Sequence, residues 1–574
     1  MGSKSTFFKF FVVVTLVVLL IFQILAMKQS DRLYERINKL QKDMGNMSFS
    51  SGNGSPASSS DDSKAGDWLV RRIGSEPPTL NPITYKDLYA SLICGSDGGN
   101  NIFETLLTYN YDTAELEALL AESWEISDDG LEFTFTIRDD AYFSDGTPVT
   151  SDDLIFAYET IINPEIDAAN LANYYKDVEG YERIDNKTVV FKMSRAYFKS
   201  LEMLGGIPVI PKHVYQFEDA SEFNQNRADP VGSGPYLFDK WDVGSQIVLT
   251  RNENYWGSKP NFKKIVYRVI SNDKAALQAL QSHTLDVLSV TPEQFVKYSQ
   301  DEEFCNNFHV ISYWNPSSGF TYVGWNSESR FFKDKLVRQA MTHIVDRDAI
   351  NEHLFKNLFR VTTGPFFFMG HQNNPEIEPW PFDPQRACEL LDEAGWKDTD
   401  GDGVRDKNGV PFNFKLTTVS ANETGEKMCL LIKDQLEQVG VIMELDPYEW
   451  SVFTDKLHKR EFEAVTLGWS GALESDPYQV WHSSQIEGGS NYVGFNVPRA
   501  DELIVQARAT IDPDKRNKLF HEFHAILHEQ QPYTFMFNRK SLVFIDKRIE
   551  NVTIHKLGLN SKEWYVPQDK QRYH

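Results

Sequence analysis

The sequence predicts a mixed α/β (α+β) protein that is built of several lobes. Its 574 residues exceed what a single hydrophobic core normally supports. Segments that alternate apolar and polar residues, as strands do, are interspersed with segments that carry apolar residues at helical spacing. No fixed repeat and no low-complexity linker divides the chain after residue 66. We therefore expect intertwined lobes rather than separate domains in series.

The first segment is expected to span a membrane. From Phe10 to Met27 no residue is charged, and at about 1.5 Å per residue a helix of this length crosses most of a ~30 Å hydrocarbon layer. Neither a convincing cleavage site nor a lipid-attachment cysteine follows it, which favours an uncleaved signal anchor. Residues 1–9 are then cytoplasmic, and the large domain lies in the periplasm or extracellular space. The lysines and arginines after the anchor favour the opposite orientation, so this assignment depends on the identity of the large domain.

Residues 28–66 are expected to connect the anchor to the body. Between Asp31 and Met47 apolar residues recur at helical spacing, which predicts a short juxtamembrane helix. Residues 48–66 are rich in serine and glycine and contain almost nothing to bury, so they predict a flexible linker. The globular body is expected to begin near Asp67.

Within the body, local patterns predict individual elements. Residues 131–137 alternate as in a half-buried strand, Asp145-Gly146 marks a turn, and Thr150 begins a helix with Asp153 three residues later. Apolar stripes predict helices over 336–344 and from Asp383-Pro384 to Gly395. Each of these helices is expected to bury one face.

Composition excludes several classes of function. The chain carries 82 acidic and 58 basic residues, a net charge of −24 that would repel nucleic acid. Four scattered cysteines form no CxxC pair, so zinc binding and thiol exchange are not indicated, and free thiols and a disulfide both remain open. No nucleophile elbow, phosphate-binding loop or dinucleotide fingerprint is present. We expect neither an enzyme nor a cofactor.

Six blocks of the body occur in a characteristic order. They are AESWEISDDGLEFTFTIRDDAYFSDGTPVTSDDLIFAYE (121–159), VGSGPYLFDKW (231–241), LTRNENYW (249–256), VRQAMTHIVDRDAI (337–350), FDPQRACELLDEAGWKDTDGDGVRDKNGVPFNF (382–414) and SNYVGFN (490–496). In content and order they resemble the family 5 extracellular solute-binding proteins of ABC importers, which include oligopeptide, dipeptide and nickel binders. The resemblance covers the whole body from residue 67.

This resemblance implies a two-lobed periplasmic-binding-protein-like fold of class II (cluster C), with an extra domain inserted in the first lobe. Lobe I would comprise 67–107, 233–312 and 545–574, the inserted domain 108–232, and lobe II 313–544. A ligand would be enclosed when the lobes close, and the closed state would be recognised by ABC transporter permease subunits.

The resemblance also implies where a ligand binds. In peptide binders of this family a stretch like 467–471 lines the cleft, which makes Gly468, Trp469, Ser470 and Gly471 candidates. The alternative for Trp469 is a core tryptophan. The family's aspartate that pairs with the ligand's ammonium group is missing after this stretch, where Ala472 and Leu473 stand. Glu474 or Asp476 would replace it, or the ligand has no free amine. Asn491, from the block SNYVGFN, completes the candidate set.

Two groups of residues in the sequence are possible metal ligands. Residues 398–406 copy the first half of a calcium loop, with candidate ligands Asp398, Asp400, Asp402 and Asp406, but Gly409 stands where a bidentate glutamate is required. A solvated turn is the preferred interpretation. The histidines at 521, 524 and 528 do not form an HExxH motif and are assigned to an ordinary amphipathic helix.

The sequence as a whole predicts an anchored binding protein that captures peptides or peptide-like solutes, or another small-molecule ligand, and delivers them to an ABC importer. The alternative is a membrane-anchored ligand sensor or assembly factor with the same binding fold. The expected partners are the permease, the ligand and the cytoplasmic membrane, and nucleic acid is excluded. A hydrolase is the least favoured possibility, because no catalytic group is apparent.

Overall fold

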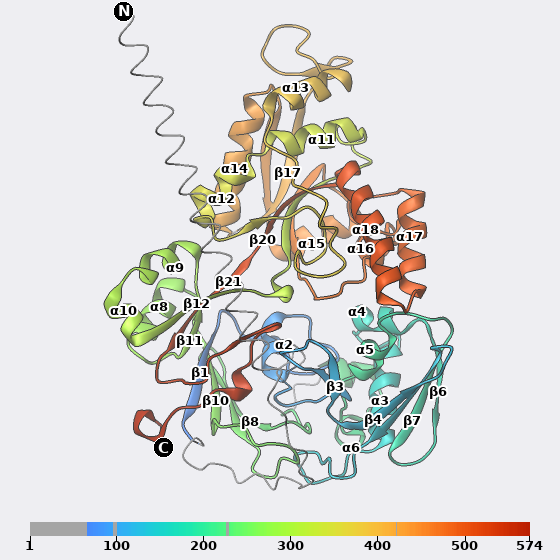
Figure 1. Cartoon of the computed structure of the whole chain (residues 1–574), viewed down its shortest axis with the longest axis vertical. Helices are drawn as coiled ribbons and strands as arrows, with labels where there is room; N and C mark the ends of the chain where they lie inside the picture. Colours follow the sequence, from blue (N-terminus) through green and yellow to red (C-terminus); the bar gives the residue numbers. More distant parts are fainter. Residues whose placement is uncertain (1–65, 96–99, 226–228, 421, 574) are drawn as a thin grey trace, which may run out of the picture. The chain divides into compact units, whose positions relative to one another are not determined.

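The computed structural model describes residues 66–95, 100–225, 229–420 and 422–573, all within one compact unit, 61–574 (Figure 1). The predicted membrane segment 10–27, the juxtamembrane helix and nearly all of the linker lie outside the described residues. Among the helices that are described, none has the length and apolar character to cross a membrane.

A seven-stranded sheet forms the first lobe. Its strand order is β12-β21-β11-β1-β10-β9-β8, and β1 pairs in parallel with β10 and β11, whereas the other pairs are antiparallel. The strands are β1 (Trp68–Ile73), β8 (Tyr236–Asp242), β9 (Gln246–Arg251), β10 (Lys264–Val269), β11 (Val287–Ser289), β12 (Phe308–Trp314) and β21 (Lys540–Asp546).

The two faces of this sheet are covered by different elements. On one face Val70 and Val266 pack against residues of α8 (Asp273–Gln281), α9 (Pro292–Ser299) and α10 (Glu302–Asn307). The opposite face packs against α2 (Leu88–Cys94) and, through Leu69 and Ile545, against Trp564 of the C-terminal segment. This segment contains the hairpin β22 (Ile554–His555) and β23 (Gly558–Leu559) and the 3-10 turns η4 (Ser561–Glu563) and η5 (Gln568–Lys570).

A second, four-stranded antiparallel sheet is formed by the segment that was predicted as the inserted domain. Its order is β4 (Ala121–Ile126), β5 (Glu132–Ile137), β7 (Thr188–Met193) and β6 (Val178–Arg183). Helix α3 (Ser151–Ile162) begins at a capping box of Thr150 and Asp153, which confirms the predicted strand and helix start. The remaining elements are β2 (Leu107–Tyr109), β3 (Leu116–Ala118), α4 (Ala169–Ala172), η1 (Asn173–Tyr175), α5 (Ser200–Gly205), α6 (Lys212–Tyr215) and α7 (Ala220–Gln225).

The second lobe contains a six-stranded sheet of order β14-β20-β13-β19-β17-β18. The strands are β13 (Phe320–Trp325), β14 (Arg360–Val361), β17 (Asn413–Val419), β18 (Ile442–Tyr448), β19 (Ala464–Trp469) and β20 (Tyr533–Asn538). A small hairpin, β15 (Asp406–Lys407) and β16 (Val410–Pro411), lies outside this sheet.

Helices cover both faces of the six-stranded sheet. One core contains residues of α11 (Lys335–Ile344), α12 (Arg347–Phe355), α13 (Pro384–Glu393) and α14 (Glu423–Glu437). The other contains residues of α15 (Trp450–Lys459), α16 (Tyr478–Trp481), α17 (Pro498–Ala509) and α18 (Pro513–Gln530). Helices α11 and α13 confirm the two apolar stripes predicted from the sequence.

Two connections join the seven-stranded and six-stranded sheets. Residues 315–319, which include the 3-10 turn η2 (Pro316–Ser318), lead from β12 to β13, and Arg539 leads from β20 to β21. Figure 1 shows β20 continuing directly into β21. The predicted division into lobes and inserted domain remains a prediction, but sheet membership places the crossings at 315–319 and 539 rather than after 312 and 544.

A buried charge cluster joins the two ends of the described chain. Arg548 donates to Asp286 at 2.8 and 2.7 Å and also to Asp67, and all three side chains are at most 3% exposed. Asp67 accepts further hydrogen bonds from the backbone N–H groups of Arg572 and Tyr573, both at 2.9 Å. Four charged or polar segments that are distant in sequence are thereby fixed around the start of β1.

All four cysteines are free, and Cys94 and Cys429 are buried.

Candidate functional site

The two connections between the sheets lie against each other and form what we call the hinge pair, residues 315–319 and Arg539. The Arg539 guanidinium donates to the Ser318 carbonyl at 3.1 Å, and the Asn538 side-chain amide donates to the Gly319 carbonyl at 3.1 Å. The hydroxyl groups of Ser318 and Ser541 are 3.2 Å apart. Because the described chain passes between the two sheets at these places, rotation between the sheets must be absorbed here.

The predicted ligand-binding segment, Gly468 to Gly471, lies directly against the hinge pair. Trp469 ends β19 and is paired with Phe320, the first residue of β13. A Cβ atom at Gly319 would lie 1.8 Å from the Trp469 carbonyl oxygen, and one at Gly471 would lie 2.2 Å from the Pro316 carbonyl oxygen. Glycine is therefore needed at positions 319 and 471, because the absence of a side chain lets the two backbone segments approach closely.

The indole of Trp469 is half-buried within a series of nearly parallel aromatic rings. It lies nearly parallel to Tyr322 and Tyr492, with ring centroids 6.4 and 6.0 Å apart, and Tyr322 stacks on Tyr533 at 3.8 Å. The indole N–H donates to the Tyr533 hydroxyl at 3.4 Å. The ring therefore offers an apolar surface to a ligand, while its polar atom is already engaged. Ser470 is exposed next to it.

The two acids predicted to hold a ligand ammonium group are engaged by arginines. Asp476 accepts from Arg508 Nε at 2.9 Å and from the Tyr197 hydroxyl at 2.9 Å, and Glu474 pairs with Arg516 at 3.3 Å. An ammonium group would have to displace these partners. In this conformation the carboxylates do not provide unpaired negative charge for a ligand.

The partners of these two acids, Arg508, Arg516 and Tyr197, belong to an extended contact between the predicted inserted domain and lobe II. The Lys199 ammonium donates to the Glu474 carbonyl at 3.0 Å, and the Phe198 N–H donates to the Arg508 carbonyl at 3.0 Å. The ring of Phe198 lies 5.9 Å from Phe520. Glu474 and Asp476 therefore take part in holding residues 197–199 against α17 and α18.

The Asn491 side chain forms its hydrogen bonds within its own loop. It is 1% exposed, and its amide donates to the carbonyls of Phe495 and His482 and accepts from the Phe495 N–H. This side chain fixes the turn after α16, and none of its polar atoms is left to bind a ligand.

Two cavities are lined wholly or partly by residues of lobe I. The first, of about 170 Å³, is walled by α2, β1, β11, β12, β21 and the C-terminal segment, and its polar lining includes Arg71, Ser91, Asn101, Ser289, Tyr313 and Lys562. We call it the α2 cavity. The second, of about 250 Å³, is more apolar and is lined by residues such as Phe103, Leu107, Tyr109 and Leu116.

Sequence reasoning missed the basic residues of the α2 cavity. Arg71 follows Leu69 and precedes Ile73 on one face of β1, and both of these neighbours are at most 1% exposed. A charged residue at an inward-facing strand position was the available signal. No local sequence pattern indicated a role for Lys562, because the cavity that it lines is formed by segments that are far apart in the sequence.

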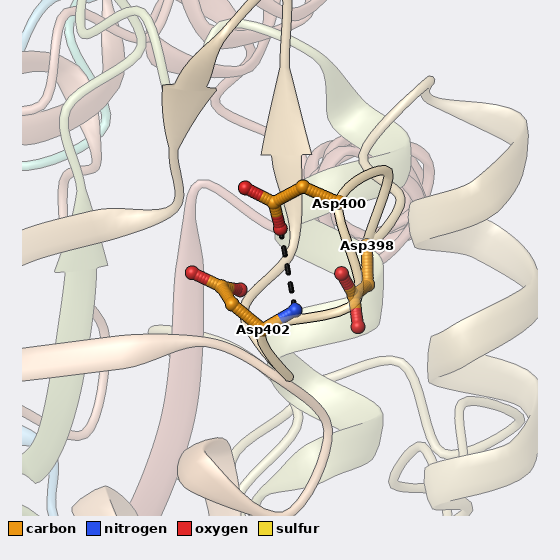
Figure 2. A group of neighbouring side chains, drawn as sticks. All are labelled: Asp398, Asp400 and Asp402. Atoms are coloured by element: carbon orange, nitrogen blue, oxygen red, sulfur yellow. Dashed lines mark hydrogen bonds between the residues drawn. The ribbon is translucent and has the colours of Figure 1, made fainter.

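The calcium-loop candidates are only partly brought together. Figure 2 shows the carboxylates of Asp398, Asp400 and Asp402 converging, and their ligand atoms lie within 4.8 Å of one another. Asp406 is used differently, since it accepts from the N–H and hydroxyl of Thr399 at 3.0 and 2.6 Å. The three converging side chains are exposed and accept backbone N–H groups of their own loop, as in a solvated Asp/Gly turn.

The three histidines of α18 are used to hold the loop 362–381. His521 Nε2 donates to the His371 carbonyl at 2.9 Å, and His528 Nε2 donates to the Glu378 carbonyl at 3.0 Å. His524 lies between them, where Nδ1 accepts the Asn374 N–H at 3.1 Å and Nε2 is 3.2 Å from the Thr363 hydroxyl. The imidazoles bind the loop individually and do not converge on a common point.

Burial of His524 predicts acid sensitivity. Desolvation lowers its pKa to about 4, against 6.5 for an exposed histidine. The unfolded chain therefore takes up a proton first as pH falls from 6.5 to about 4, and this residue costs up to about 3 kcal/mol of stability across that window. His524→Asn removes this titration, so we expect a flatter dependence of unfolding free energy on pH. Equal slopes for both proteins in urea titrations at pH 4 to 6.5 would refute the assignment.

Comparisons with known proteins agree on one family. The pattern that defines the bacterial extracellular solute-binding proteins, family 5, matches residues 115–491. The oligopeptide-binding protein AppA of Bacillus subtilis is 29% identical over 516 residues, covering 88% of this chain and 92% of AppA. Heme-binding protein A of Haemophilus influenzae is 26% identical over 459 residues, 75% of this chain and 80% of that protein.

Solved structures agree as well. The structure of Bacillus subtilis AppA with a nonapeptide superposes with a TM-score of 0.76 at 28% identity, covering 88% of this chain and 99% of AppA. NikZ of Campylobacter jejuni, solved with Ni(L-His), gives a TM-score of 0.75 at 23% identity over 87% of this chain and 99% of NikZ, which is a likeness of fold.

Proposed function

The chain belongs to family 5 of the bacterial extracellular solute-binding proteins, and from this premise we propose that it captures peptides or peptide-like solutes and delivers them to an ABC importer. The family consists of extracytoplasmic binding proteins of ABC importers and not of enzymes. The predicted family membership is thereby confirmed. The proposal concerns the ligand that this chain binds.

The observation that carries the proposal is the hinge pair beside Trp469, in a chain similar to AppA. AppA was solved with a nonapeptide. A binding surface next to the crossing strands changes its surroundings when the lobes rotate, so a ligand held there favours one conformation. A permease can then distinguish the loaded from the empty protein. Aromatic surface next to backbone groups suits ligands with varied side chains.

We further propose that residues 10–27 anchor the protein in the cytoplasmic membrane, with the body outside. The support is the uncharged composition of this segment followed by the Ser/Gly-rich residues 48–66. A linker of this composition suits a carrier, which has to reach the permease and need not transmit force to the membrane.

Native mass spectrometry of the full chain in detergent, purified without denaturation, tests the peptide proposal. Heterogeneous bound masses that fragment as short peptides are expected. A single bound species that is not a peptide would retain the binding fold and reject peptide specificity. Purified protein that neither carries peptides nor gains thermal stability with a tetrapeptide mixture would reject the proposal.

Trp469 is expected to be an important contact for the ligand. Trp469→Ala should weaken binding of a tetrapeptide mixture by about tenfold or more, because a half-buried aromatic ring at a binding surface contributes about 2 kcal/mol or more when it is an interface anchor. Trp469→Phe should retain most of the affinity, since the stack on Tyr322 persists. The control is Trp450→Ala, a tryptophan that is 57% exposed on α15. Calorimetric affinities that are unchanged in Trp469→Ala would place this ring in the core only.

A further inference from the structure

The α2 cavity adjoins the hinge strands and carries an unusual polar lining. Tyr313 of β12 and Val543 of β21, the two strands that continue into the hinge pair, both contribute to its wall. Leu559 to Lys562 of the C-terminal segment line it from the other side. A ligand group in this cavity would therefore contact the two strands that lead into the hinge pair.

Arg71 extends into this cavity without a counter-ion. Within the described part of the chain its guanidinium donates no hydrogen bond and forms no ion pair, and its electrostatic neighbours are the phenols of Tyr267 and Tyr313. The next residue, Arg72, points to the opposite face and is fully engaged by the Ile270 carbonyl at 2.7 Å and by Asp273 at 2.7 Å. A partly buried guanidinium without an ion pair is available to bind an anion that enters the cavity.

Lys562 brings a second positive charge to the same cavity. It stands in the 3-10 turn η4, and its ammonium group makes no hydrogen bond or ion pair with any described residue. The residue is exposed to solvent on one side, and the protein atoms around its ammonium group lower its pKa. Of the nearby acids, Glu117 lies beyond ion-pair distance, and Glu104 is buried and already accepts from the Tyr255 hydroxyl at 2.6 Å and the Trp256 N–H at 3.1 Å.

This arrangement contrasts with the remainder of the protein. With a net charge of −24, the surface repels anions, so two cations without an ion pair that line one cavity are not explained by the average composition. At the predicted ammonium site the opposite holds, since Asp476 and Glu474 are neutralised by Arg508 and Arg516. Of these two places, the α2 cavity is the one that offers a ligand unpaired charge, and that charge is positive.

We propose that Arg71 and Lys562 form a subsite that binds a carboxylate of the ligand, so that the protein selects peptides or peptide-like solutes that carry a free carboxylate. The inference rests on the proposed function and names its substrate class. The carboxylate belongs either to the peptide C-terminus or to an acidic side chain. With about 170 Å³, the cavity admits one residue-sized group and leaves the rest of a peptide outside.

The test uses the full chain in detergent, freed of co-purified ligand, and four probes in calorimetry and thermal shift. They are tetra-alanine, its C-terminal amide, the amide with one alanine replaced by glutamate, and glutarate. The variants are Arg71→Gln and Lys562→Gln, and the matched control is Arg72→Gln. Lys562 lies in a short surface turn, so its variant tests the subsite even where Arg71→Gln disturbs folding.

A carboxylate-bearing peptide should bind about 10- to 100-fold more tightly than the neutral amide, as expected for a charge-assisted pair. Arg71→Gln and Lys562→Gln should remove this difference, whereas Arg72→Gln should keep it. Preference for free tetra-alanine identifies the terminus, and preference for the glutamate-containing amide identifies a side chain.

Equal binding of acid and amide, unchanged in Arg71→Gln, would overturn the subsite and leave the proposed peptide function intact. Binding of glutarate alone, lost in Arg71→Gln, would keep the subsite and reject peptides as ligands. Failure of every probe to bind would overturn both.

Discussion

Replacing Arg548 with methionine is expected to lower the free energy of unfolding by about 3–5 kcal/mol, because it leaves buried Asp67 without its positive partner and buried Asp286 with only Arg572, 3.8 Å away. Asp67 is completely buried and Asp286 is 2% exposed. Burial already raises the pKa of Asp286, and the Arg548 guanidinium opposes that rise. Methionine fills a similar volume, so the loss reports the missing charge and hydrogen bonds rather than a cavity.

Urea unfolding at pH 7, followed by circular dichroism, measures the effect. Arg386→Met is the matched control, since Arg386 is 47% exposed and pairs only with Glu389 on the surface of α13. That pair should contribute less than about 1 kcal/mol. Equal unfolding free energies for the two variants would show that the buried cluster does not stabilise the body.

Much of the fold could be predicted because its signals are local. The strand over 131–137 and the helices at 336–344 and 384–393 each follow from periodicity within one segment, and Thr150 with Asp153 marks a helix start by chemistry alone. The connections between the two sheets, at 315–319 and 539, lie a few residues from the lobe boundaries that the resemblance implied, and those boundaries stay a prediction. A strand that continues from one sheet into another has the same alternation throughout, so its sequence does not mark the crossing.

The sequence predicted which segment of the chain forms the candidate site, but not the contacts of its acidic side chains. The resemblance to the family identified the segment Gly468 to Gly471, which proves to lie at the hinge pair. The roles of Glu474 and Asp476 could not be inferred, because their partner Arg516 and the Tyr197 hydroxyl lie far away in the sequence. Whether an acid is unpaired depends on such distant contacts, and these follow only from the tertiary structure.

Gly319→Ala is expected to destabilise the body by roughly 3 to 5 kcal/mol and to weaken ligand binding at least tenfold. Gly319 has φ 60° and ψ −149°, a conformation that is essentially restricted to glycine. In addition, the new Cβ would lie 1.8 Å from the Trp469 carbonyl oxygen and 2.8 Å from the Gly471 nitrogen, so β19 must move away from the hinge pair. Displacing the Trp469 backbone would misplace the ring proposed to contact the ligand.

Gly244→Ala separates the two causes. Gly244 also has a positive φ, 77°, but a Cβ there would meet nothing within 4 Å, so only backbone strain of about 1 kcal/mol is expected, with no change in ligand affinity. Both variants would be compared by urea unfolding and by calorimetric titration with the tetrapeptide mixture. If Gly319→Ala behaved like Gly244→Ala in both measurements, strain alone would account for it. The close packing of the hinge pair against Trp469 would then have no part in binding, because the segment could relax without displacing the indole.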